Sequence, residues 1–184
     1  MRIVATAIPD VRLVEFERFD DARGAFAEIY DAAKFRALGI DTVFVMDAWS
    51  VSRRAGTVRG LHFQTPPCVQ AKLIHVPKGR LFDVAVDLRR SSPTFGRHAV
   101  CELRAGDCRQ LFVPAGFAHG FCTLEPDTEI VYKMSAPYAP DRYGGVVWND
   151  PALGIDWPIS ETDAVVSEQD SRWPRLAALG PVFD

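Results

Sequence analysis

The sequence predicts an all-β fold, a jelly roll of two sheets, from three observations. Short apolar segments recur along the chain, and several alternate apolar with polar residues, which is the period of a half-buried strand. Gly, Pro, Asp or Ser bounds these segments, and almost no helical periodicity lies between them. The 13 Gly and 13 Pro are spread over the chain, and no internal repeat is present. Many short strands joined by turns favour an antiparallel sandwich or barrel over an alternating α/β fold.

The expected strands follow from this alternation. The clearest is 80–88, in which four apolar side chains share one face and Asp83 and Asp87 share the other. A second, 57–67, runs into a Pro-Pro turn. The other expected strands are 11–16, 43–51, 69–76, 98–103, 110–114, 120–124 and 129–134.

Two regions depart from the strand pattern. Residues 31–38 begin at an aspartate, a good N-cap residue, and end before a glycine, which predicts a short helix. The C-terminal region loses the alternation and carries Trp148, Trp157 and Trp173 with several prolines. We expect this region to form a tail packed over the barrel, so that residues 1–184 make a single domain.

Composition narrows the range of functions. The chain is 48% hydrophobic and 24% charged, as in ordinary globular proteins, and its net charge of -3 argues against nucleic-acid binding. A local basic patch for one small phosphorylated ligand stays open. No stretch approaches the roughly 18 apolar residues of a membrane helix, and no secretion signal is evident at the start. The four cysteines form no CxxC pair. We therefore expect a cytoplasmic protein with reduced thiols, in contact with neither membrane nor nucleic acid.

Several polar side chains interrupt apolar strands and are candidates for chemistry. Arg59, His62 and Gln64 lie in the strand 57–67. Lys72 lies in the strand 69–76, where a lysine directed into a barrel is costly unless it meets an anion or a developing negative charge. On these residues alone, a solvent-facing Lys72 and a core His62 with satisfied hydrogen bonds remain open.

The segment 113–121 contains a Pro-x-Gly-x-x-His spacing that ends at His119 and resembles the second cupin motif, in which the histidine often binds a metal. The His-x-His pair of a metal-binding cupin is absent, since the corresponding place reads His62-Phe63-Gln64. Because one imidazole needs partner ligands to hold a divalent ion, we expect no metal site. Tyr132 reads as a core aromatic residue, and Asp170 as either a solvated turn acid or a helix cap.

A set of longer motifs identifies a family resemblance. The motifs are DARGAFAE (21–28), RGLHFQ (59–64), QAKL (70–73), LFDVAVDLRRSSPTFG (81–96), VPAGFAHGF (113–121), IVYK (130–133), WNDPALGIDWP (148–158) and SEQD (167–170). In this order, and over nearly its whole length, the chain resembles the dTDP-4-dehydrorhamnose 3,5-epimerase family. The resemblance implies a cupin-type jelly roll, a homodimer, and catalysis without a metal or organic cofactor.

The resemblance also implies catalytic roles. A 4-keto sugar has acidic C–H bonds at C3 and C5, so a base can remove either proton and an acid can return one to the opposite face. His62 corresponds to the base, Asp170 to the residue that orients its imidazole, and Tyr132 to the acid. Lys72 corresponds to the group that stabilises the oxyanion at C4. The implied reaction converts dTDP-4-dehydro-6-deoxy-D-glucose to dTDP-4-dehydro-L-rhamnose, a step of deoxysugar biosynthesis.

Six further positions match family residues that bind the substrate, a nucleotide diphosphate-sugar that is dTDP-linked in the family. Arginine suits phosphate oxygens, and an aromatic ring suits the base. By resemblance, Arg23, Glu28 and Arg59 contact the substrate, Phe26 and Tyr138 line it with Tyr138 stacking near the base, and His119 is a residue of the pocket rather than a metal ligand.

Four positions depart from the family pattern. Met46 and Ala48 replace a Gln-x-Asn pair, Tyr143 replaces a glutamate, and Gln169 replaces a lysine. The implied catalytic residues are intact, whereas positions that recognise the ligand are altered. Epimerisation at C3 alone and action on another nucleotide-linked 4-keto sugar therefore stay open. Two further alternatives are a cupin module that binds a sugar nucleotide without turnover and a metal-dependent cupin oxygenase or isomerase.

Overall fold

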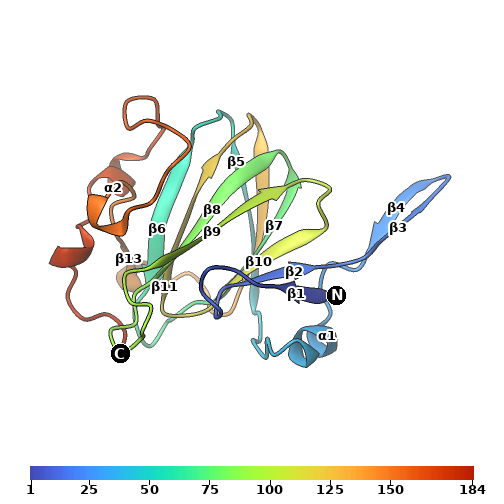
Figure 1. Cartoon of the computed structure of the whole chain (residues 1–184), viewed down its shortest axis with the longest axis horizontal. Coiled ribbons are helices and arrows are strands. Elements are labelled where there is room, and N and C mark those ends of the chain that lie inside the picture. The colour runs from blue at the N-terminus through green and yellow to red at the C-terminus, as the bar shows by residue number, and fades with distance from the viewer.

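Two antiparallel sheets face one another in a computed structural model of residues 1–184 (Figure 1). The six-stranded sheet has the order β1-β2-β10-β7-β12-β5, and the five-stranded sheet has the order β13-β6-β11-β8-β9. Their bounds are β1 Arg2–Val4, β2 Arg12–Glu15, β5 Met46–Ser52, β6 Val58–Gln64, β7 Lys72–Lys78, β8 Arg80–Asp87, β9 His98–Arg104, β10 Arg109–Val113, β11 Phe117–Thr123, β12 Thr128–Met134 and β13 Tyr143–Gly145. The expected jelly roll is confirmed.

Apolar side chains from both sheets meet in the main core, which includes Leu13, Ile74, Leu81, Leu111 and Ile130. Burial of this contiguous apolar surface is the main favourable contribution to folding. Alternation along each strand sends every second side chain into the space between the sheets. Polar side chains at the same inward positions therefore lie in the barrel interior.

A short helix covers the outer face of the six-stranded sheet. Helix α1 spans Ala32–Ala37, and the Asp31 carboxylate caps it by accepting a hydrogen bond of 2.8 Å from the Lys34 backbone N–H. Phe35 anchors the helix in a cluster with Val14 and Phe112. The predicted helix at 31–38 is therefore present, with its expected N-cap.

The C-terminal region covers the outer face of the five-stranded sheet (Figure 1). Its short helices are η1 Pro140–Arg142, η2 Pro151–Leu153, α2 Glu168–Ser171 and η3 Leu176–Ala178. Leu153 and Phe183 pack against Val84 and Val86 of β8, as expected for a tail on the barrel. The tail thus covers the face of β8 that carries Val84 and Val86, and the face that carries Asp83 lies in the barrel interior, so the expectation of a half-buried strand is wrong. Asp83 and Asp87 are both fully buried instead.

Asp87 is buried at the end of β8, where three polar side chains bind its carboxylate. Arg89 pairs with both carboxylate oxygens at 2.7 to 2.9 Å, and the hydroxyls of Ser92 and Thr94 each donate at 2.6 Å. Burial alone would raise the pKa of Asp87, but these donors stabilise the carboxylate and lower its pKa to about 2. The carboxylate thus ties the 87–94 loop to the sheet.

We expect Asp87→Asn to destabilise the fold by about 2 kcal/mol at pH 7, since the depressed pKa is a stability term. This contribution is complete above the unfolded pKa of about 4 and is lost as the pH falls towards 2. Urea unfolding at pH 7 and pH 2.5 measures the difference, with Asp107→Asn on an exposed turn as the control. A deficit that is equally large at pH 2.5 would contradict the ionic origin of the effect.

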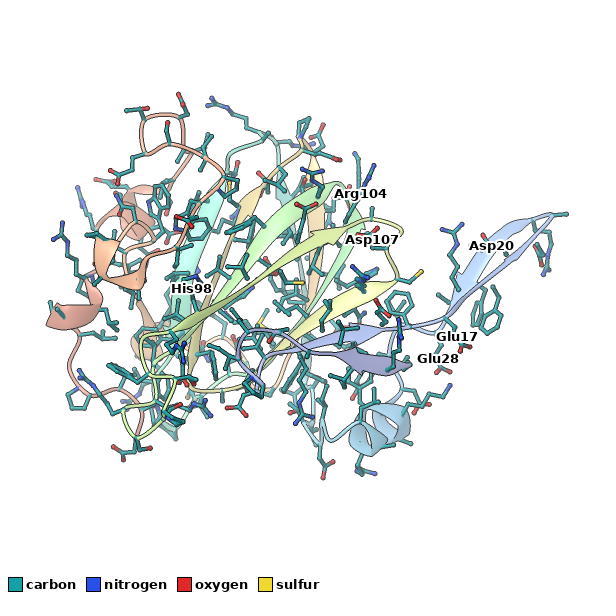
Figure 2. The ribbon with its side chains drawn as sticks, in the orientation of Figure 1. Glu17, Asp20, Glu28, His98, Arg104 and Asp107 are labelled. Carbon is teal, nitrogen blue, oxygen red and sulfur yellow. The ribbon has the colours of Figure 1, made fainter.

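One hairpin extends away from both sheets (Figure 1). It consists of β3 Arg18–Asp21 and β4 Gly24–Ala27, which pair only with one another. Asp20 lies on this arm and Glu28 lies at its base in Figure 2. Phe19 and Phe26 are directly opposite in the register and are 60% and 70% exposed. The two rings therefore form apolar surface that the chain itself does not cover. Because isolated two-stranded hairpins are only marginally stable in water, contact with a second surface would stabilise this arm.

Two further observations concern membrane-spanning helices and cysteine pairing. No helix is long and apolar enough to cross a membrane. The four cysteines are all free thiols.

Candidate active site

A cavity of about 480 Å³ opens between the two sheets. Strands β5, β6, β7, β11 and β12 contribute its wall, and two tyrosines from the segments that follow β12 complete it. The lining residues are Met46, Ala48, Trp49, Ser50, Arg59, His62, Gln70, Lys72, His119, Phe121, Tyr132, Met134, Tyr138 and Tyr143. Six of the ten residues predicted for the site are in this set.

A histidine–aspartate pair forms one side of the cavity. His62 Nε2 lies 2.6 Å from Asp170 Oδ1, although the two residues are 108 positions apart. The Asp170 carboxylate also accepts hydrogen bonds from the Gly60 backbone N–H at 3.1 Å and from Trp173 Nε1 at 3.2 Å. With Nε2 bound to the carboxylate, Nδ1 of His62 is the nitrogen left to act on a ligand.

Asp170 is a buried carboxylate in the short helix α2, with only 5% of its surface exposed. The Ser167 hydroxyl caps this helix by accepting from the Asp170 backbone N–H at 3.0 Å. Burial alone would raise the pKa of Asp170, but the hydrogen bonds from His62, Gly60 and Trp173 hold it below the ordinary value. Asp170 is therefore a buried anion next to the imidazole. The two expectations from the sequence, a solvated turn acid and a helix cap, are both wrong.

The electrostatics keep His62 neutral in the free protein. Burial lowers the pKa of His62, the adjacent Asp170 carboxylate opposes this effect, and the positive charge of Lys72 adds to it. A neutral imidazole can accept a proton, and the carboxylate behind it stabilises the imidazolium that forms. The pair has the geometry of a general base with an orienting anion.

Lys72 faces the cavity from the start of β7, so the alternative of a solvent-facing lysine is wrong. Burial lowers the pKa of Lys72 to about 8, and the Asp83 carboxylate opposes the shift. The ammonium group is therefore still the main form at pH 7. A cation in a low-dielectric environment stabilises an oxyanion far better than a solvated cation does.

Tyr132 reaches the cavity from β12. Burial raises the pKa of its phenol, and a hydrogen bond with Ser50 moderates the shift. The two hydroxyl oxygens lie 3.4 Å apart. A phenol with a raised pKa keeps its proton at neutral pH, so Tyr132 is a proton donor rather than a base.

His119 lies inside the barrel and is paired with Asp83. The Nε2 atom of His119 is 2.6 Å from Asp83 Oδ1, and the two side chains are 4% and 0% exposed. His119 pairs with His62 across β11 and β6. No group of three or more His, Cys, Asp or Glu side chains comes together as candidate metal ligands.

Arg59 lies at the rim of the cavity. Its guanidinium donates to the Ser52 hydroxyl at 3.3 Å and to the Val51 carbonyl at 3.2 Å, and neither partner is a carboxylate. Tyr138, which lines the same cavity, is 58% exposed and packs edge to face on Tyr143 at 5.4 Å between ring centroids. The rim therefore combines a free cation with aromatic surface, as a nucleotide diphosphate requires.

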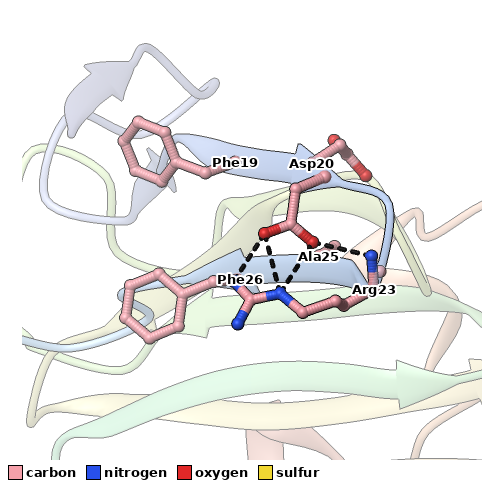
Figure 3. A pocket seen from close by; sticks show the side chains of 7 residues that line it. Phe19, Asp20, Arg23, Ala25 and Phe26 are labelled. Carbon is pink, nitrogen blue, oxygen red and sulfur yellow. Dashed lines mark hydrogen bonds and ion pairs between the residues drawn. The ribbon is translucent and has the colours of Figure 1, made fainter.

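Three of the predicted substrate-binding residues do not reach the cavity of their own chain. Arg23 and Phe26 lie on the extended hairpin, where they line a shallow hollow with Phe19 and Asp20 (Figure 3). Arg23 pairs with Asp21 at 2.6 Å, and at the base of the arm Glu28 pairs with Lys34 at 2.5 Å. Arg23 and Phe26 are exposed, Glu28 is half-buried, and all three belong to a different surface of the same chain.

The four positions that depart from the family pattern surround the site. Met46, Ala48 and Tyr143 line the main cavity, and Gln169 lines an adjoining cavity of about 390 Å³. Arg59, His62 and Tyr143 line both cavities and so form the wall between them.

Some site residues were missed by sequence reasoning. Ser50 lies in the expected strand 43–51, and Gln70 is two residues before Lys72 on the same expected strand face, so strand position could have indicated both. Met134 shares a face with Tyr132. Trp173, which donates to Asp170, carries no such signal.

The fold and the site define the class of protein: a two-sheet jelly roll whose central cavity holds a buried His–Asp pair together with a lysine and a tyrosine. Comparison with known proteins gives the family. The family model described as dTDP-4-dehydrorhamnose 3,5-epimerase matches residues 5–178. The chain belongs to this family.

Similar proteins cover the whole chain. A dTDP-4-dehydrorhamnose 3,5-epimerase of Sinorhizobium fredii is 47% identical over 183 residues, which is 100% of this chain and 93% of the relative. The crystal structure of the dTDP-6-deoxy-D-glucose-3,5-epimerase of Legionella pneumophila, in complex with dTDP-4-keto-L-rhamnose, has a TM-score of 0.92 and 37% identity and covers 97% of this chain and 94% of that one. A 3'-monoepimerase of Streptomyces bikiniensis in complex with dTDP-quinovose has a TM-score of 0.87 and 34% identity, with 96% and 88% covered.

Proposed function

We propose that this protein epimerises dTDP-4-dehydro-6-deoxy-D-glucose at C3 and C5, giving dTDP-4-dehydro-L-rhamnose for deoxysugar biosynthesis. The observation that carries the proposal is the buried His62–Asp170 pair, which shares one cavity with Lys72 and Tyr132 in a member of this family. Residues suited to be a base, an acid and an oxyanion-stabilising cation therefore border the same space, as inversion at a carbon next to a ketone requires.

The reaction begins with His62. The C4 ketone acidifies the C–H bonds at C3 and C5, and Nδ1 of the neutral imidazole takes one of these protons. The electron pair of the C–H bond forms the enolate, whose negative charge lies on the C4 oxygen. Asp170, 2.6 Å from Nε2, stabilises the imidazolium that results.

Lys72 stabilises the enolate. Its ammonium group is desolvated before the substrate arrives, so its charge is not shielded by water when the C4 oxygen becomes negative. With a pKa of about 8, Lys72 is protonated at pH 7 and deprotonates under mildly alkaline conditions.

Tyr132 completes the inversion by donating its phenolic proton to the carbon on the face opposite His62. The enolate becomes a ketone again, and the tyrosinate that remains regains a proton while the His62 imidazolium loses one, through exchange with solvent. Each epimerised carbon thereby exchanges one hydrogen, and a reaction at both carbons requires this cycle twice.

Arg59 and Tyr138 hold the nucleotide at the rim in this proposal. The unpaired guanidinium of Arg59 binds the diphosphate, and the exposed Tyr138 ring stacks near the base. His119 contributes to the wall of the sugar pocket. The main alternative is epimerisation at C3 alone, which stays open because Met46 and Ala48 in the cavity wall depart from the family pattern.

A homodimer is part of the proposal, because the hairpin can supply Arg23, Phe26 and Glu28 to the cavity of a second copy. Two features support it. The hairpin carries the exposed Phe19 and Phe26, and strand β5 is an unpaired edge of the six-stranded sheet. Three apolar side chains along and before that edge are 58% to 72% exposed: Val43, Val45 and Trp49. Edge strands and apolar patches of this kind are usually covered.

The four free thiols support a cytoplasmic location as a further part of the proposal, because disulfides are rare in the reducing cytoplasm.

Mixing two inactive variants tests the shared site. Arg23→Ala and His62→Ala each remove activity from a homodimer of their own. When they are refolded together, half of the dimers are mixed, and each mixed dimer has one site with both native residues, so about a quarter of the wild-type activity returns. A refolded mixture of Arg23→Ala with Arg23→Ala/His62→Ala is the control. No recovery in mixed dimers verified by mass would contradict the exchange of the hairpin.

The substrate assignment is tested by adding the purified protein to dTDP-4-dehydro-6-deoxy-D-glucose and following the NMR signals of the sugar. Conversion to the L-rhamno ketone supports epimerisation at both carbons, and a product inverted at C3 alone supports the alternative. Equal ligand binding by the wild type and His62→Ala, with no proton exchange in either, would instead support a binding module.

A further inference from the structure

We propose that Trp173 is a positioning residue for the reaction, which holds the His62–Asp170 pair in its catalytic orientation from behind. This inference rests on the proposed function for its effect on turnover. Trp173 lines neither the main cavity nor the adjoining one, so it acts through other side chains.

The first contact is with the aspartate. Trp173 Nε1 donates to Asp170 Oδ1 at 3.2 Å, and the same oxygen lies 2.6 Å from His62 Nε2. The other oxygen, Oδ2, accepts from the Gly60 backbone N–H at 3.1 Å. Donors on both carboxylate oxygens prevent rotation of the Asp170 side chain, and the carboxylate in turn fixes the plane and tautomer of the imidazole.

The second contact is with strand β13, which lies beside His62. Gly145 is opposite His62 in the β13–β6 register, and a Cβ atom at this position would lie 2.6 Å from three atoms of the Trp173 ring. The indole therefore packs directly on the glycine backbone. The adjacent Pro174 carbonyl accepts from the Val147 N–H at 2.9 Å, which fixes the chain that carries the indole.

The third contact reaches the histidine through a tyrosine. The Tyr143 ring lies 6.0 Å from the Trp173 ring, edge to face, and 5.1 Å from the His62 ring. Such aromatic pairs contribute packing with a preferred geometry. Trp173 thus supports the carboxylate directly and the imidazole through Tyr143.

The arrangement has a consequence for the titration of His62. The charged or titratable groups that face it are Asp170 from α2, Lys72 from β7, His119 from β11 and Tyr143 from β13. Burial is the main cause that lowers the pKa of His62. Loss of the indole admits water behind the pair, and loss of its N–H leaves the carboxylate a stronger partner for an imidazolium. Both effects raise the pKa of His62.

The test compares Trp173→Phe with Trp157→Phe. Trp157 is a matched control, since its Nε1 donates to the Trp148 carbonyl at 2.8 Å away from the site. We expect Trp173→Phe to lower kcat by about 10-fold, with KM changed by about 2-fold or less, and Trp173→Ala to lower kcat by about 100-fold. The acid limb of the pH profile moves up by about half a unit or more in both Trp173 variants.

A second measurement does not depend on turnover. In the free protein, the His62 ring is titrated by NMR, and the hydrogen-bonded Nε2 proton is observed directly. We expect Trp173→Phe to raise the pKa of His62 and to broaden or shift the Nε2 proton signal, and Trp157→Phe to change neither. Gly145→Ala displaces the indole but keeps its N–H. We expect this variant also to raise the pKa of His62 and to broaden or shift the Nε2 proton signal.

Equal behaviour of the Trp173 and Trp157 variants in both measurements would overturn the inference. If the wild type does not epimerise the substrate but Trp173→Phe still changes the His62 titration, then the proposed function fails and the positioning of the His–Asp pair stands. If the wild type is active and Trp173→Phe leaves kcat, the pH profile and the Nε2 signal unchanged, then the positioning role fails and the function stands.

Discussion

We expect His62→Ala to lower kcat by about 10²- to 10⁴-fold, the range observed for loss of a positioned general acid or base. Alanine removes the imidazole, whose Nε2 is bound to Asp170 and whose Nδ1 is the proposed base. Water can occupy the space, but a water molecule is a far weaker base than a neutral imidazole. Initial rates of product formation, measured with saturating substrate, give the effect.

His98→Ala is the control for this substitution, since His98 begins β9 and is not part of the cavity wall. Thermal unfolding of both variants separates a catalytic from a folding defect. Retention of more than a tenth of the wild-type turnover by folded His62→Ala would show that another group is the base.

Lys72→Met is expected to lower kcat by about 10²- to 10³-fold, the usual effect of removing one preorganised group that stabilises an oxyanion. Methionine keeps most of the length of the side chain but carries no charge. The wild type loses activity above about pH 8, where the Lys72 ammonium deprotonates. It also loses activity as the pH falls through the pKa of His62, which burial places below the ordinary value of 6.5. Lys72→Met should keep the acid limb and lose the alkaline one.

The matched control is Lys78→Met at the exposed end of the same strand, which should keep both limbs of the profile. Rates are measured between pH 5 and 9.5. An alkaline limb that persists near pH 8 in Lys72→Met would assign that titration to a different group and remove Lys72 from its proposed role.

Much of the fold was accessible from the sequence, because strand alternation and turn residues act locally. The strands around Phe82, Leu111 and Ile130 and the helix capped by Asp31 were all predicted within a few residues. The depth at which β8 is buried was not. Alternation cannot reveal whether the outer face of a strand meets water or another segment. Here the C-terminal tail covers the face of β8 that carries Val84 and Val86, and the face that carries the buried Asp83 lies in the barrel interior.

The site was less accessible, since it joins residues that are far apart in the chain. The sequence indicated His62 and Lys72 as candidates, because they are polar side chains in apolar strands. Nothing in the local sequence connects Asp170 or Trp173 to His62, and only the fold brings them together. The resemblance supplied Arg23 and the other hairpin residues, but it could not indicate that they lie away from the cavity of their own chain.

The most direct test of epimerisation with His62 as the base is an NMR time course of dTDP-4-dehydro-6-deoxy-D-glucose in D2O with the wild type and His62→Ala. We expect the wild type to incorporate deuterium at both C3 and C5 while forming the L-rhamno ketone, and His62→Ala to incorporate deuterium at neither carbon on the same timescale. Incorporation by His62→Ala at the wild-type rate, or none by the folded wild type, would contradict this expectation.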